Sequence, residues 1–140
     1  MKKLLGCFLC VMLLTFGAQA HALMITPSST PQWSGPETSQ DENNSIIIGY
    51  TGYNDALYKQ DEGGGESGDL AGSYETEFFD IPTDPSGATI TYTGGDIVGP
   101  PAFLLVKDGN HTPGWYLFGL NSMGWDGMDT LTLEGFWPNQ

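Results

Sequence analysis

The sequence predicts an all-β fold: a β-sandwich of about seven or more short antiparallel strands, with a jelly-roll arrangement as the main alternative. Three observations predict this class. Short segments alternate apolar with polar residues, and clusters of glycine, proline, asparagine and aspartate separate them. In addition, no segment of ten residues has helical periodicity without an interrupting glycine or proline. This pattern does not determine the order of the strands.

Residues 1–20 form a separate segment. Two lysines precede an apolar run, and Ala18-Gln19-Ala20 is a small-x-small cleavage site. These features are typical of a secretory signal peptide, helical and removed after Ala20, and the apolar run is too short for a membrane span. Cleavage would leave 120 of the 140 residues, which is enough for one domain with a modest core.

The exported chain divides into a leader and a sandwich domain. Residues 21–44 are rich in proline, serine, threonine, glutamine and asparagine, and they predict an irregular leader or a first edge strand. The sandwich domain is predicted over 45–140. It begins with SIIIGY (45–50), a β-branched run typical of a buried strand. Residues 57–59 are a candidate for another short strand, and the glycine-rich acidic stretch 61–69 is predicted as a loop.

Three later segments show strand alternation clearly. In residues 74–78, tyrosine, threonine and phenylalanine share one face and two glutamates the other. Residues 88–92 alternate with threonines, which predicts a half-buried strand with a threonine-lined outer face. Another strand is predicted over 131–134.

A hairpin is predicted near the C-terminus. Residues 103–107 and 115–120 are apolar runs, and the segment 108–114 between them contains glycine, asparagine and proline. Because this turn is longer than a tight hairpin connection, we expect local hydrogen bonds from the side chains of Asp108 and Asn110.

Charge and cysteine content limit the function classes. Both cysteines lie within residues 1–20, so the exported chain has no disulfide and no thiol chemistry. It keeps two lysines, Lys59 and Lys107, against 17 acidic residues, a formal charge of −15. Such a chain is a poor candidate for binding nucleic acid or an anionic membrane. The many acidic residues predict either a solvated, negatively charged surface or a site that binds divalent cations.

The predicted loop 61–69 is the candidate metal site. Asp61, Glu62, Glu66 and Asp69 supply hard oxygen ligands among glycines, as Ca²⁺ prefers. Their spacing does not match the twelve-residue helix–loop–helix pattern. The alternative is a flexible, solvated loop without a metal.

The sequence predicts no catalytic residues and no cofactor; a calcium ion at 61–69 is a candidate only, and the metal-free loop is the favoured interpretation. His111 could serve as a metal ligand or an acid–base group beside Asp108, but a turn residue whose ring caps backbone groups is the simpler interpretation. Glu75 and Glu77 lie about 7 Å apart along one strand face by the strand rise, as a carboxylate pair could, and both are expected to be exposed.

Four aromatic residues are the candidate ligand-binding residues. Trp115, Tyr116, Trp125 and Trp137 suggest a carbohydrate platform, because flat aromatic rings stack on sugar faces. The alternative is that they belong to the core. Trp115 and Tyr116 are adjacent on a predicted strand, so one is expected to be buried and the other partly exposed.

Several motifs resemble a known family. "KDGNHTPGWYLF" (107–118), followed by "GWDG" and "TLTLEGFWP", resembles bacterial exported proteins that carry a C-terminal PEP-CTERM sorting signal. "LYKQDEGGGESGDLAGSYETEF" (57–78) and "SGATITYTGG" (86–95) extend the resemblance to roughly residues 50–138. It implies export and sorting to the envelope or the exopolysaccharide matrix, and it implies no shared enzymatic activity.

The sequence departs from this family after Phe136-Trp137-Pro138. The family continues through a further strand, a Pro-Glu-Pro motif, an apolar span and a basic tail, whereas this sequence stops at Gln140. We expect either a truncated product or a variant released as a soluble protein. A sorting transpeptidase (exosortase) is a partner only if a missing C-terminal signal exists.

The favoured hypothesis is a non-enzymatic, acidic, secreted protein of the cell surface or extracellular matrix, with exopolysaccharide or other matrix components as partners. The second is a carbohydrate-binding β-sandwich module with a structural calcium ion. A hydrolase is the third.

Overall fold

The computed structural model describes residues 21–30, 32–36, 43–55, 57–80, 85–108 and 111–137. The predicted signal peptide, parts of the leader, the tip of the predicted hairpin turn with Asn110, and the last three residues lie outside these ranges. No helix within the described ranges is long and apolar enough to cross a bilayer.

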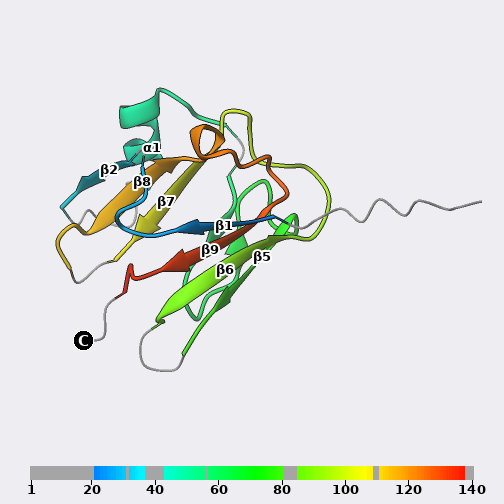
Figure 1. The fold of residues 1–140 in the computed structure, drawn as a ribbon. Coiled ribbons are helices and arrows are strands. Elements are labelled where there is room, and N and C mark those ends of the chain that lie inside the picture. The colour runs from blue at the N-terminus through cyan, green and yellow to red at the C-terminus, as the bar shows by residue number, and fades with distance from the viewer. Residues whose placement is uncertain are drawn as a thin grey trace, which may run out of the picture.

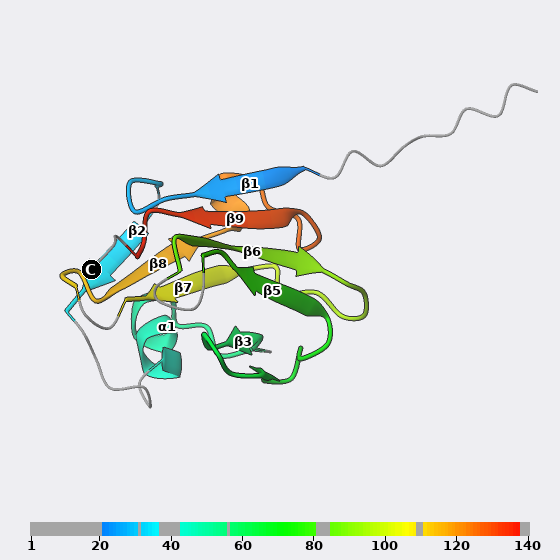
Figure 2. The same cartoon turned by 90° about the horizontal axis from the view of Figure 1, so that it is seen from below.

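Two sheets face each other and confirm the predicted sandwich (Figure 1). Figure 2 shows the four-stranded sheet in the order β1, β9, β6, β5, and the three-stranded sheet has the order β2, β8, β7. A two-stranded ribbon, β3–β4, accompanies them. The strands are β1 (Ala22–Ile25), β2 (Gln32–Gly35), β3 (Lys59–Gln60), β4 (Glu66–Ser67), β5 (Tyr74–Phe78), β6 (Gly87–Tyr92), β7 (Phe103–Lys107), β8 (Trp115–Gly119) and β9 (Thr130–Glu134).

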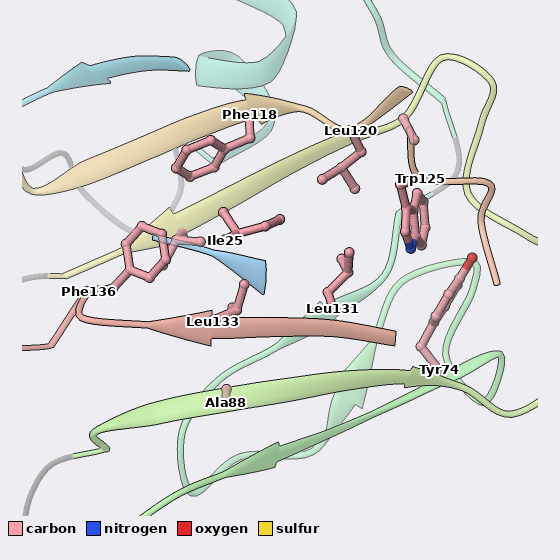
Figure 3. Close-up of a cluster of buried hydrophobic side chains, with 11 residues drawn as sticks. Ile25, Tyr74, Ala88, Phe118, Leu120, Trp125, Leu131, Leu133 and Phe136 are labelled. Carbon is pink, nitrogen blue, oxygen red and sulfur yellow. The ribbon is translucent and has the colours of Figure 1, made fainter. Parts of the chain in front are cut away.

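The main core fills the space between the two sheets (Figure 3). Strand alternation directs every second side chain inward, so Val106 and Phe118 from one sheet meet Leu131 and Leu133 from the other. The outward face of the four-stranded sheet carries Glu75, Glu77 and the threonines of β6 and β9. The core cluster comprises Ile25, Tyr74, Ala88, Ala102, Val106, Phe118, Leu120, Trp125, Leu131, Leu133 and Phe136.

The predicted hairpin is confirmed. β7 and β8 pair antiparallel, with Phe103 opposite Gly119 and Lys107 opposite Trp115. The N–H of Asp108 donates to the carbonyl of Gly114 at 2.9 Å, which extends the ladder into the turn. The strands predicted at 74–78, 88–92 and 131–134 are also present as β5, β6 and β9.

The strand predicted at 45–50 is wrong, because these residues lie in a helix, α1 (Asn43–Thr51). The helix covers the outer face of the three-stranded sheet (Figure 1), where Ile46 packs with Trp115 and Leu117. A short apolar run fits a buried strand or a helix equally well, and here packing against the sheet outweighs the weak helix propensity of isoleucine. Gly52, at φ +70°, follows the helix and donates to the carbonyl of Ile48.

The leader supplies an edge strand to each sheet, β1 and β2. Two further expectations need correction. β1 pairs parallel with β9, so the strands are not all antiparallel. Because most of the chain lies between these two strands, no hairpin turn forces them to run antiparallel. The candidate strand at 57–59 is shifted to β3, whose partner β4 lies within the stretch predicted to be only a loop.

Candidate functional site

The structure does not bring the four predicted aromatic residues onto one surface. Trp115 and Trp125 are only 3% and 4% exposed, and they belong to two different clusters. Trp115 lies under α1 on the outer face of the three-stranded sheet, whereas Trp125 lies in the main core near Tyr74 (Figure 3). Neither presents an exposed ring face to a sugar, because both are packed by neighbouring side chains. The predicted alternation of Trp115 and Tyr116 is confirmed, since only Trp115 is buried.

Tyr116 and Trp137 are half-buried against the main core. The ring of Tyr116 packs edge-on against Phe136, with the centroids 5.3 Å apart. The indole Nε1 of Trp137 donates to the backbone carbonyl of Lys107 at 3.1 Å. Trp137 thereby ties the segment after β9 to the end of β7.

An exposed aromatic pair lies elsewhere, formed by Trp33 on β2 and Tyr50 on α1. Trp33 is 38% exposed and Tyr50 is 52% exposed, and their ring centroids are 6.4 Å apart. Tyr50 also packs edge-on against the buried Trp115, at 5.2 Å. The sequence does not predict this pair, because its members are distant in sequence and Tyr50 lies in a run that is typical of a strand. The available signal was Trp33, an isolated tryptophan in a polar leader.

The acidic residues of 61–69 do not converge. Asp61, Glu62, Glu66 and Asp69 are all exposed. Asp61 forms an ion pair with Lys59, with Oδ2 and Nζ 2.8 Å apart, and a carboxylate oxygen of Glu66 accepts the N–H of Gly72 at 3.0 Å. Across the described residues, no group of three or more histidine, cysteine, aspartate or glutamate side chains is arranged to hold a metal ion.

His111 lies beside a buried carboxylate. Its Nδ1 is 2.7 Å from Oδ2 of Asp108, and Asp108 is only 6% exposed. The contact is an ion pair when the imidazole is protonated. The ring therefore faces a carboxylate, whereas the sequence predicted that it caps backbone groups.

These two residues line a cavity of about 370 Å³, which we name the inter-sheet cavity. It lies along β7 and β5, at the side where each sheet has an edge strand, and residues 57–62 form another wall. Its apolar lining includes Phe78, Ile90, Leu104, Val106, Leu133 and Trp137. Its charged lining comprises Lys59, Asp61, Glu62, Lys107, Asp108 and His111.

Two features of this lining bear on what the cavity can bind. Both lysines that follow residue 20 are present in it, so its charge is more balanced than that of the acidic chain as a whole. Tyr58 also lines it, with its hydroxyl 2.9 Å from Oγ1 of Thr76. Burial raises the pKa of Tyr58, although the hydrogen bond with Thr76 lowers it in part, so the phenol remains a neutral hydrogen-bonding group.

Comparisons with protein-family models, with curated proteins and with solved structures found no match.

Proposed function

We propose that the chain is a secreted, non-enzymatic protein that associates with the cell surface or the extracellular matrix. The observation that carries the proposal is that the residues directly after the predicted cleavage site are built into a sheet. β1 starts at Ala22, and the carbonyl of His21 accepts the N–H of Thr130 at 3.1 Å. Removal of residues 1–20 would therefore leave β1 and its pairing with β9 intact.

The PEP-CTERM resemblance supports the same proposal. The motif at 107–118 spans the turn and most of β8, where Leu117 and Phe118 are fully buried. The resemblance therefore involves residues that build the sandwich, as expected for a family that shares an exported domain and has no common active site. A charge of −15 keeps such a domain hydrated outside the cell.

Expression of the full chain in an exopolysaccharide-producing bacterium tests this proposal. Intact-mass measurement of the exported protein should give an N-terminus at His21 or Leu23, and matrix fractions should retain the protein. The matched control replaces Ala18 and Ala20 by leucine, which should block cleavage. Exported protein that retains Cys7 and Cys10, or wild-type protein confined to the cytoplasm, would contradict the proposal.

A second candidate function is carbohydrate binding, favoured by the exposed pair of Trp33 and Tyr50. Two partly exposed rings 6.4 Å apart can each contact an apolar sugar face, and the rest of each ring is held by packing. A neutral glycan is the expected ligand because an acidic one would be repelled by the net charge. The pair replaces Trp115 and Trp125 as the aromatic platform in this proposal.

Glycan-array binding and matrix co-sedimentation test the second candidate. Trp33→Ala and Tyr50→Ala should each reduce saturable binding at least about tenfold, which corresponds to about 1.4 kcal/mol. Met128→Ala is the matched control, because Met128 is 54% exposed and lies outside the pair. Binding that survives both aromatic substitutions would exclude this platform.

A further inference from the structure

The four-stranded sheet extends to the residue that directly follows the predicted cleavage site. The carbonyl of His21 accepts the N–H of Thr130 at 3.1 Å, and all four residues of β1 pair in parallel register with β9. Figure 2 shows the two strands side by side, with β1 at the edge of the sheet. The peptide bond between Ala20 and His21 is therefore attached directly to a hydrogen-bonded strand.

Side chains and the following turn hold β1 in place. Ile25 is fully buried in the main core, and Leu23 packs against the same cluster. After the strand, the N–H of Ser29 donates to the carbonyl of Thr26, and the N–H of Thr26 donates to Oγ of Ser29, each at 2.9 Å. Release of β1 from β9 would break backbone hydrogen bonds and expose apolar surface, so the docked strand is the favoured state of the folded chain.

The docked strand is a poor substrate for an endopeptidase. Whether a bond can be cleaved depends on the burial and hydrogen bonding of the backbone around it. A peptidase that recognises a short motif binds an extended segment through its backbone groups. In the folded chain the carbonyl of His21 is already bonded to Thr130, and the next four residues are paired. Cleavage after Ala20 therefore requires that β1 first leave the sheet.

We propose that docking of β1 against β9 protects the Ala20–His21 bond, so that the peptidase removes residues 1–20 before β1 docks. Hydrolysis breaks the bond between the carbonyl carbon of Ala20 and the nitrogen of His21. Water supplies the oxygen of the new carboxylate and the proton of the new amino group. The inference rests on the proposed export and goes beyond it, because it orders two steps, cleavage and docking. A precursor that folds first retains residues 1–20.

Cleavage of the full-length precursor by a purified signal peptidase in detergent micelles tests the proposal. The precursor is compared in two states, either folded before the enzyme is added or diluted from urea directly into the enzyme. Mass spectrometry measures the rate at which a chain beginning at His21 appears. The folded precursor should be cleaved at least about tenfold more slowly than the denatured one, because the rate follows the population of the opened form.

Two isoleucine variants locate the protection in β1. Ile25→Ala weakens the anchor of β1 in the main core. Ile46→Ala is the matched control, since Ile46 is 7% exposed and lies in α1 against the other sheet. The rate for each folded variant is divided by the rate for the same variant diluted from urea. This ratio should rise at least about fivefold more in Ile25→Ala than in Ile46→Ala.

The outcomes separate this inference from the proposed export. Circular dichroism checks that both variants fold, and the two states of the wild type decide the question if Ile25→Ala does not. Equal cleavage of the folded and denatured wild type, or equal effects of the two variants, would overturn the inference and leave the export unaffected. Failure of the denatured precursor to be cleaved after Ala20 would overturn both.

Discussion

The hydroxyl of Tyr74 donates a hydrogen bond to the backbone carbonyl of Gly127, at 2.9 Å, across 53 positions of sequence. The same hydroxyl accepts the N–H of Val98, also at 2.9 Å. Tyr74 is only 2% exposed, so one buried group connects β5 to the segment before β7 and to the segment before β9. Gly127 has φ +97°, a conformation that residues with a side chain rarely adopt. The backbone therefore places this carbonyl toward Tyr74 most readily when residue 127 is glycine.

Replacement of Tyr74 by phenylalanine should lower the free energy of unfolding by about 1–3 kcal/mol, because it leaves the part-buried N–H of Val98 and the buried carbonyl of Gly127 without their partner. Tyr92→Phe is the matched control. The hydroxyl of Tyr92 donates to the carbonyl of Gly95 at 2.6 Å in an exposed setting, where water can replace it. Urea unfolding followed by tryptophan fluorescence measures both, and equal losses would contradict this role of Tyr74.

The protein should lose stability at alkaline pH. Burial raises the pKa of Tyr74 above its ordinary value of 10.0, although the bond from the Val98 N–H lowers it in part, and burial similarly raises the pKa of Tyr58. The folded state thus holds these phenol protons more tightly than the unfolded state. The resulting stability is complete below pH 10 and is lost as the pH rises through the raised pKa values. Urea unfolding between about pH 8 and about pH 11 should show this decline, with a smaller slope in Tyr74→Phe. A flat profile would contradict the prediction.

Two glycines should respond oppositely to alanine. A Cβ at Gly35 would lie 2.5 Å from Cζ2 of the buried Trp115, so Gly35→Ala should destabilise the protein by about 1–3 kcal/mol. A Cβ at Gly49, within α1, would meet no atom within 4 Å, so Gly49→Ala should stabilise it by about 0.5–1 kcal/mol. Thermal unfolding compares the pair. Stabilisation by Gly35→Ala would show that β2 does not pack over Trp115 as described.

Two isoleucines distinguish the helix from the strand that the sequence predicted. In a strand, Ile46 and Ile48 would share one face and respond alike to substitution. In α1, Ile46 is 7% exposed and packs near Trp115, whereas Ile48 is 39% exposed. Ile46→Ala should therefore cost about 2–4 kcal/mol and Ile48→Ala less than about 1 kcal/mol. Similar losses for both, measured by urea unfolding, would favour the strand.

Calcium should have no specific effect. Since the acids of 61–69 are exposed and unconverged, Ca²⁺ and Mg²⁺ should raise the melting temperature slightly and to similar extents, by screening the net charge. A calcium site would instead add about 2.7 kcal/mol at a hundredfold excess over its dissociation constant, with much less from Mg²⁺. Calorimetry on the wild type and on the double variant Asp61→Asn, Asp69→Asn separates the two outcomes. A large Ca²⁺ preference that the variant loses would establish the site.

The strands that could be predicted are those whose two faces differ. In β5, Tyr74 and Phe78 face the core while Glu75 and Glu77 face solvent, so alternation is visible in the sequence. The run at 45–50 is apolar throughout its middle and has no such contrast, so its periodicity could not distinguish a helix from a buried strand. The parallel pairing of β1 with β9 could not be predicted either, because the alternation of residues along a strand does not indicate which strands pair.

The candidate site was harder to predict because it depends on which side chains remain exposed after the sheets and α1 have packed. Because adjacent residues on a strand point to opposite faces, the sequence correctly predicted that Trp115 and Tyr116 lie on opposite faces of the sheet. It did not predict which face α1 would cover. Trp33 becomes part of a surface pair only when β2 docks against β8 and α1 crosses the sheet. The inter-sheet cavity likewise combines residues from both sheets with residues 57–62, and its location depends on which strands lie at the edges.

The position of β9 has a consequence for the timing of folding. β9 lies between β1, with which it runs parallel, and β6, so that residue 22 pairs with residue 130. A chain that is synthesised from its N-terminus presents β1 long before this partner arrives. Pairings of such high sequence separation form slowly, since a long loop must close first. The four-stranded sheet can therefore close only after β9 has been synthesised, and under the proposed export this delay would leave the sheet unformed while the chain crosses the membrane.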